Sequence, residues 1–191
     1  MTTKIAALLQ AATERTVPVI LALPDAALGA PTPCGEYDVR ELMRHLFQVV
    51  VNFQVLAAKG QPDWSGPAPE LDGDWRQRFA AEAAALVAAW GEPGADEGLL
   101  GSMSMPAETV GALALMDLAV HGWDLARATG LPYRPAPETV AVLGPLTEEL
   151  APNGRQMGMF AEPVAYAGAD PFEALLALTG RDPGWAAEPV R

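Results

Sequence analysis

The residues best suited to chemistry lie in one largely apolar stretch, Leu113–Gly130, which reads LALMDLAVHGWDLARATG. Asp117 and His121 are four residues apart in it, and a helix places such a pair on one face, roughly 5–6 Å apart at Cβ. A carboxylate and an imidazole at that spacing can bind one cation. The only other histidine, His45, lies in a second apolar stretch. These three residues predict a metal site between two helices.

Two imidazoles and one carboxylate would leave coordination positions open, which is typical of catalytic zinc sites and not of closed structural ones. The same ligands also suit non-haem Fe(II). A metal held in this way would polarise a bound water or bind and ionise a thiol. Asp124, three residues after His121, is predicted to orient the imidazole ring of this ligand without binding the metal itself. A local ion pair between Asp124 and Arg127 is an equal alternative.

A narrow polar line runs along the helix expected between Asp38 and about Lys59, which is otherwise apolar almost all the way round. At about 100° per residue, its members are Glu41, His45, Gln48 and Asn52. A helix facing water usually shows a broad charged face. The thin line between apolar flanks therefore predicts a polar pocket inside a helical bundle.

The helix that carries the carboxylate repeats this pattern, with Asp117, His121 and Asp124 on one stripe among apolar side chains. A buried, unpaired carboxylate is costly in free energy. A cation between Asp117 and the two imidazoles would remove that cost. In the alternative interpretation, Asp117 forms an ordinary ion pair with His121. Arg44 or Arg127 could equally supply the positive charge.

Several other side chains are candidates for binding a substrate or cofactor. Cys34, the single cysteine, precedes a predicted helix N-terminus that could lower its pKa, although a buried loop cysteine is the commoner finding. Gln48 and Asn52 are predicted polar contacts to the ligand. Arg127, like Arg44, could bind an anionic substrate or a thiol cofactor, with surface pairing as the alternative.

Length and composition limit the classes of function. The 191 residues, half of them hydrophobic, predict one domain over residues 1–191. A net charge of −12 argues against nucleic acid and anionic membranes as partners. One cysteine excludes an intramolecular disulfide, and the N-terminus predicts an amphipathic helix, not a signal peptide. We expect a cytoplasmic protein that acts on a small molecule, without a membrane span.

Hydrophobic periodicity and helix-breaking residues divide the chain into elements. The expected helices are Thr3–Leu23, Asp38–Lys59, Asp74–Trp90, Ala107–Gly130, Pro137–Leu150 and Phe172–Thr179. Pro18 predicts a kink or an early end of the first helix. Leu99–Met105 is expected to be extended and Pro152–Asp170 irregular. Four long helices with little strand predict an all-α four-helix bundle with additional short C-terminal helices and long loops.

Three segments carry a resemblance to a known family. They are TPCGEYDVRELMRHLFQVV (Thr32–Val50), LALMDLAVHGWDLARATGLPY (Leu113–Tyr133) and the weaker FEALLALTGRDP (Phe172–Pro183). With them, the chain resembles the DinB/YfiT-like metalloenzymes. Within that superfamily it is most similar to small actinobacterial metal-binding proteins related to the N-terminal domain of mycothiol-dependent maleylpyruvate isomerase.

The resemblance implies a four-helix bundle that binds a divalent metal, usually zinc or nickel. The family's ligands are a histidine on the second helix and a carboxylate-x-x-x-histidine on a later one, which fall on His45, Asp117 and His121. The isomerase has glutamate where Asp117 stands, and the shorter arm would shift the metal or admit another water. It also has a second domain, so its activity is not transferred. Related bundles often pair, so we expect a homodimer.

The leading hypothesis is a metal-dependent enzyme that activates a low-molecular-weight thiol, such as mycothiol or bacillithiol, for transfer, addition or isomerisation. Zinc is the expected metal, with nickel or iron as alternatives. A metal-dependent hydrolase is a second hypothesis, for which the polar stripes offer no clear general base apart from Glu41 and Asp124. A non-catalytic metal-binding or sensor module is the third.

Overall fold

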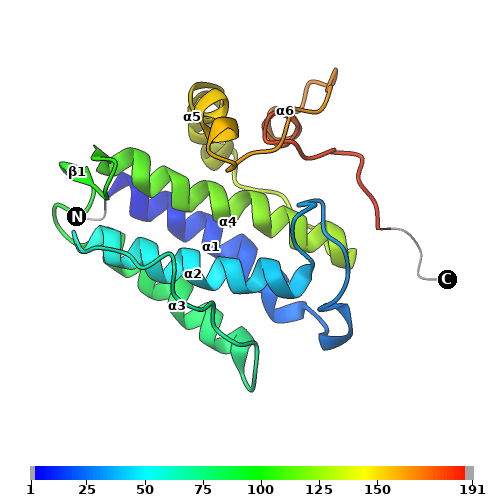
Figure 1. The fold of residues 1–191 in the computed structure, drawn as a ribbon, viewed down its shortest axis with the longest axis horizontal. Helices are drawn as coiled ribbons and strands as arrows, with labels where there is room; N and C mark the ends of the chain where they lie inside the picture. The colour runs from blue at the N-terminus through cyan, green and yellow to red at the C-terminus, as the bar shows by residue number, and fades with distance from the viewer. Residues whose placement is uncertain (1–2, 188–191) are drawn as a thin grey trace.

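The computed structural model describes residues 3–187, and most of them are helical (Figure 1). The helices are α1 (Lys4–Ala22), α2 (Val39–Ala57), α3 (Trp75–Gly91), α4 (Ala107–Thr129), α5 (Pro137–Gln156) and α6 (Pro171–Leu178). A short 3₁₀ helix, η1 (Asp25–Ala27), follows α1. Strands β1 (Leu99–Leu100) and β2 (Met105–Pro106) pair as a small antiparallel hairpin. The predicted all-α class is therefore confirmed.

Helices α1 to α4 form the bundle, in which α1 and α2 each pack against both α3 and α4. Its core is apolar, and the large side chains that it buries almost completely include Leu9, Leu46, Phe79, Trp90 and Leu115. Helices α5 and α6 pack together on one side of the bundle, above α4 in Figure 1. The four-helix bundle is thus as predicted, but α5 is a long helix of 20 residues and not a short one.

A capping box starts α2, the helix that carries His45. The Asp38 carboxylate accepts a hydrogen bond from the Glu41 backbone N–H at 2.8 Å, and the Glu41 carboxylate accepts one from the Asp38 N–H at 3.0 Å. This arrangement satisfies two backbone donors that the first turn of a helix leaves free. It confirms the predicted start of the helix. The helix ends at Ala57, two residues before the predicted Lys59.

Two helices continue through prolines near which an end was expected, with a kink as the alternative at Pro18. α1 runs through Pro18 to Ala22 without an early end. α5 contains Pro152 and continues to Gln156, so the predicted end at Leu150 is wrong. A proline inside a helix costs about 3 kcal/mol. In α5, the last turns still bury Ala151 and Gly154.

Close contact between α4 and its neighbours depends on two glycines. A Cβ atom at Gly111 would lie 2.5 Å from an Ile5 side-chain carbon. A Cβ atom at Gly122, next to His121, would lie 2.8 Å from the Thr16 hydroxyl and 2.9 Å from the Tyr133 ring. Glycine at these positions lets α4 approach α1 and so sets the position of the residues that α4 carries.

Helix α1 is the one helix within residues 3–187 that is long and apolar enough to cross a membrane by length and composition. It packs against α3 and α4, and its buried residues include Leu9 and Ile20. Core helices of soluble proteins pass the same test. The helix is therefore weak evidence for a membrane span.

Candidate metal centre

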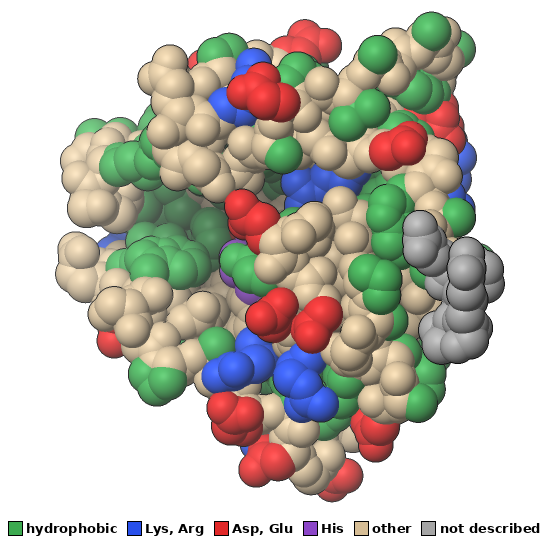
Figure 2. All heavy atoms as spheres, turned by 45° about the vertical axis from the view of Figure 1, so that its right-hand side comes forward, with side chains coloured by type: hydrophobic (Ala, Val, Ile, Leu, Met, Phe, Trp, Pro, Cys, Tyr) green, Lys and Arg blue, Asp and Glu red, His purple; other side chains and the backbone are tan. Residues whose placement is uncertain are grey.

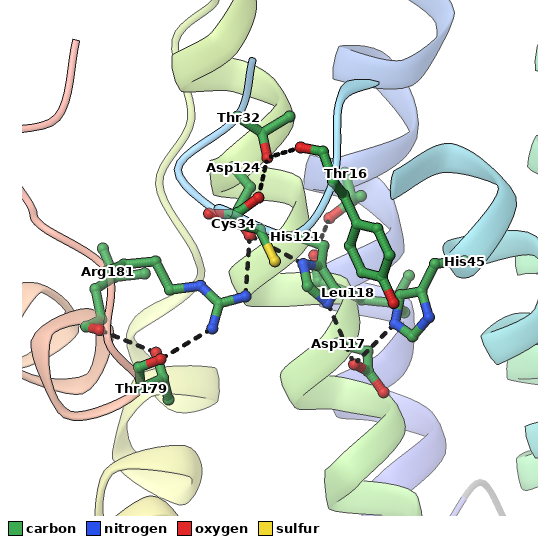
Figure 3. A network of polar contacts seen from close by, with 12 residues as sticks. Thr16, Thr32, Cys34, His45, Asp117, Leu118, His121, Asp124, Thr179 and Arg181 are labelled. Atoms are coloured by element: carbon green, nitrogen blue, oxygen red, sulfur yellow. Dashed lines mark hydrogen bonds and ion pairs between the residues drawn. The ribbon is translucent and has the colours of Figure 1, made fainter. Parts of the chain in front are cut away.

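The three predicted metal ligands come together between α2 and α4. Asp117 Oδ1 lies 3.6 Å from His121 Nε2 and 3.8 Å from His45 Nε2. The ligand atoms of the three residues all lie within 4.8 Å of one another. Figure 3 shows His45, on α2, facing Asp117 and His121 on α4. The i,i+4 spacing on α4 places two of the donors, and packing against α2 supplies the third.

The separations between these donor atoms fit a shared divalent cation. Both distances to Asp117 Oδ1 are too long for good hydrogen bonds. Two atoms that each lie about 2.1 Å from a zinc ion are roughly 3.4 Å apart in a tetrahedral site, close to the observed spacing. The side chains of His45 and Asp117 are each 29% exposed, so a ligand can reach them. The donors present therefore suit zinc or a similar ion.

The second ring nitrogen of His121 has a partner of its own. His121 Nδ1 lies 2.9 Å from Asp124 Oδ2, one turn further along α4. Because the fully buried carboxylate accepts this hydrogen bond, Nδ1 carries the proton and Nε2 keeps a free lone pair. The predicted contact between Asp124 and the ring is confirmed, and the alternative pair with Arg127 is not formed.

The environment keeps the His121 imidazole neutral. Burial is the largest effect and lowers its pKa below the ordinary value of 6.5, while the hydrogen bond to Asp124 opposes that shift. A neutral imidazole is the form that binds a metal. His121 is therefore ready to act as a ligand near pH 7.

Arg181 completes the buried polar network, and sequence reasoning missed it. It follows α6, and its NH2 group donates to Asp124 Oδ2 at 3.3 Å, while NH1 donates to the Thr179 carbonyl at 3.0 Å (Figure 3). Its side chain is only 9% exposed. The pair compensates the buried Asp124 charge. The only signal in the sequence was its place in the FEALLALTGRDP segment.

The donors open into a cavity of about 970 Å³. α2 and α4 supply its long walls, and residues from the segments 33–37, 61–64, 100–105, 157–161 and 179–181 supply the rest. Figure 2 shows this hollow, with hydrophobic side chains on its walls and a histidine inside it. Substrate sites in enzymes are commonly cavities of this kind, with a few polar groups in a largely apolar wall.

A family profile described as the mycothiol maleylpyruvate isomerase N-terminal domain matches residues 9–126. The chain belongs to this family. The matched range covers most of the chain and includes His45, Asp117, His121 and Asp124. The chain thus has the DinB-like fold that the resemblance implied. No curated protein and no solved structure matches the chain significantly.

Cys34 lies in the loop before α2 and lines the cavity. Its sulfur lies within 4.8 Å of donor atoms of His121 and Asp124. Burial raises the pKa of the Cys34 thiol, and the Arg181 charge only partly opposes this. The pKa is therefore not lowered by the helix N-terminus, and the favoured interpretation of Cys34 as a buried loop cysteine agrees with its surroundings. The tyrosine of the same loop, Tyr37, was missed by sequence reasoning and stacks on the His45 ring with centroids 5.4 Å apart.

The three residues predicted to contact a cofactor have other partners in the structure. Gln48 donates to the Gly66 carbonyl at 2.8 Å, and Asn52 donates to the Asp63 carbonyl at 3.1 Å. Both therefore hold the loop after α2 against that helix. Arg127 donates to backbone carbonyls of the segment after α6. None of the three lies in the wall of the cavity.

Proposed function

We propose that this protein is a divalent-metal-binding enzyme that uses a low-molecular-weight thiol, such as mycothiol, for transfer or isomerisation. The observation that carries the proposal is the convergence of His45, Asp117 and His121 at the wall of a cavity of substrate size. The family supports the thiol, since its description is that of a mycothiol-dependent enzyme. Zinc is the proposed metal, with nickel or iron as alternatives.

When bound, the ion would supply Lewis-acid chemistry that favours the thiolate form of the cofactor. The chain's own residues prepare the site for it. Asp124 fixes the His121 ring with Nε2 directed to the centre, and Arg181 compensates the buried carboxylate. Tyr37 stacks on His45 and holds that ring in place. We place the protein in the cytoplasm, where thiols stay reduced.

The two alternatives have less support from the contacts around the site. A hydrolase needs a base to activate water, and Glu41 instead caps α2 while Asp124 is bound to His121 and Arg181. Neither carboxylate is free to take a proton from a substrate in the cavity. A non-catalytic metal-binding module would use the same donors, so measurement of turnover has to separate it from an enzyme.

Metal content provides the first test. We expect near-stoichiometric zinc in the wild-type protein by elemental analysis, and strong loss in both His45→Ala and His121→Ala. Gln48→Ala, on α2 outside the cavity wall, is the matched control and should keep its metal. Equal metal content in the wild type and both histidine variants would remove the basis of the proposal.

Thiol dependence provides the second test. Metal-loaded protein should bind mycothiol in calorimetry and convert members of a panel of small electrophiles only when the thiol is present. Hydrolysis of model esters or amides without a thiol would favour the hydrolase. Metal binding with neither activity would favour the non-catalytic module.

A further inference from the structure

The cavity extends far beyond the metal donors along α2 and α4. His45 and Leu56 both line it from α2, and the stretch of helix between them is roughly 16 Å long at 1.5 Å per residue. Val110 and His121 line it from the two ends of a similar stretch of α4. The Leu56 side chain lies 3.7 Å from the Cβ position of Gly101, just before α4 begins. The two helices are therefore antiparallel, and the far end of the cavity lies between the end of α2 and the start of α4.

The chemistry of the wall changes along this length. The acidic and basic side chains in the wall, such as Glu36, Asp117 and Arg181, gather at the end that holds the histidines. The remaining part, which we name the apolar arm, is lined by Val49, Phe53, Leu56, Leu100, Val110 and Leu113. Green side chains cover the walls of the hollow in Figure 2. The wall thus offers charged groups and imidazoles at one end and mainly hydrophobic contacts along the rest of its length, where Gln61 and Ser102 are uncharged polar residues that also line it.

Two large apolar side chains stand at the entrance of the arm. Trp64 is 49% exposed and Met103 is 60% exposed, and both line the cavity. Side chains of this size are costly to expose together, and such patches commonly mark ligand-binding sites. The apolar surface therefore continues from the entrance into the arm.

We infer that the substrate of this site carries an extended apolar body, such as a medium-length alkyl chain or a long aryl group, that lies in the apolar arm. Its reactive group then lies at the polar end, beside His45, Asp117 and His121. Low-molecular-weight thiols are polar and would leave the arm unfilled, as would a small dicarboxylic acid. The cavity, at about 970 Å³, has room for a thiol and such a substrate together. The assignment as a substrate rests on the proposed function, whereas the binding of an apolar chain does not.

A chain-length series tests the inference on the wild-type protein. Butanoate, octanoate and dodecanoate share one carboxylate, so differences in affinity report on the chain alone. Each buried methylene contributes about fourfold in affinity. We expect octanoate to bind at least tenfold more tightly than butanoate, by calorimetry, in both the metal-loaded and the metal-free protein. Equal affinity for all three acids would overturn the inference.

A variant that blocks the apolar arm shows where the alkyl chain of the ligand binds. Leu113 is half-buried and lies midway along the arm, so Leu113→Trp should lower the affinity for octanoate and dodecanoate at least tenfold and leave butanoate unchanged. Leu99→Trp makes the same change at a side chain that is 65% exposed and outside the wall, and should bind like the wild type. Equal binding of the fatty acids by the two variants would show that the alkyl chain lies outside the apolar arm, and would overturn the inference.

Metal content measured on the same samples separates this inference from the proposed function. Chain-length dependence in a protein that never holds metal would overturn the proposed metal enzyme and keep the apolar-ligand site. Stoichiometric metal without chain-length dependence would overturn the apolar-ligand site and leave the metal enzyme. If Leu113→Trp fails to fold, the wild-type series still decides the question.

Discussion

Asp124 Oδ2 accepts hydrogen bonds from both His121 Nδ1, at 2.9 Å, and Arg181 NH2, at 3.3 Å. One buried oxygen thus links the candidate ligand on α4 to a guanidinium that follows α6. The carboxylate fixes the orientation of the imidazole, and the guanidinium compensates the charge of the carboxylate. The position of His121 Nε2 therefore depends on the segment that follows α6 as well as on α4.

Replacing Asp124 tests its role as a positioning residue. Asp124→Asn keeps the size of the side chain but removes the charge that favours the Nδ1–H form of His121. We expect metal affinity to fall about 10- to 100-fold, measured by competition with a chelator. Glu108→Gln, in the exposed first turn of α4, is the control and should bind metal like the wild type. Unchanged affinity in Asp124→Asn would contradict the positioning role.

Removing the Arg181 charge should affect stability. Arg181→Met leaves Asp124 buried without its ion pair, so we expect the free energy of unfolding to fall by about 3 kcal/mol in urea titration. Arg134→Met is the matched control, since Arg134 pairs with Asp170 but its side chain is 73% exposed. A surface pair of that kind contributes about 1 kcal/mol or less. Equal losses in the two variants would contradict the importance of burial.

Two substitutions at Asp117 test separately the negative charge and the length of its side chain. Asp117→Asn removes the negative donor between the histidines, and we expect most of the bound metal to be lost in elemental analysis. Asp117→Glu introduces the residue that the isomerase carries at this position, so it should retain near-stoichiometric metal. Retention by Asp117→Asn would show that the carboxylate does not bind the ion.

Ionisation of Tyr133 should destabilise the fold at high pH. Thr16 donates its hydroxyl proton to the Leu118 carbonyl at 3.0 Å, so the Tyr133 hydroxyl donates to Thr16 across their 3.2 Å contact. Burial raises the pKa of Tyr133 from 10.0 to about 12. Between those values the folded protein keeps a proton that the unfolded chain releases, so stability falls as the pH rises.

Urea titrations at pH 9, 10 and 11 can measure this loss. The contribution of Tyr133 is fully present below pH 10, and about 1 kcal/mol of it should be lost by pH 11. Tyr133→Phe has no such proton to lose and should decline less steeply over the same range. Parallel declines in the two proteins would show that Tyr133 is not the group responsible.

Gly122 should not tolerate a side chain, because α4 lies close to α1 and Tyr133 there. A Cβ atom would lie 2.8 Å from the Thr16 hydroxyl and 2.9 Å from the Tyr133 ring, so Gly122→Ala should lower the free energy of unfolding by about 1–3 kcal/mol. Gly144→Ala, on α5, meets nothing within 4 Å and should be neutral or stabilising. Urea midpoints of both variants provide the comparison.

The sequence alone was sufficient for features that depend on nearby residues. Helix periodicity and the Asp38–Glu41 capping box predicted the helices of the bundle, since hydrogen bonds and side-chain contacts along a helix join residues a few positions apart. The same geometry predicted that Asp117 and His121 share a face, and that Asp124 reaches the His121 ring. The polar stripe on a second helix indicated His45 as their partner, and the resemblance implied the same three ligands.

Only the tertiary structure could show which distant groups meet. Arg181 reaches Asp124 across 57 residues of chain, and Gln48 and Asn52 contact a loop instead of the cavity. The raised pKa of Cys34 likewise results from burial, which no local pattern reports. Such contacts depend on how the helices and loops pack together. A periodic pattern specifies the face on which a side chain lies, whereas packing decides what that face touches.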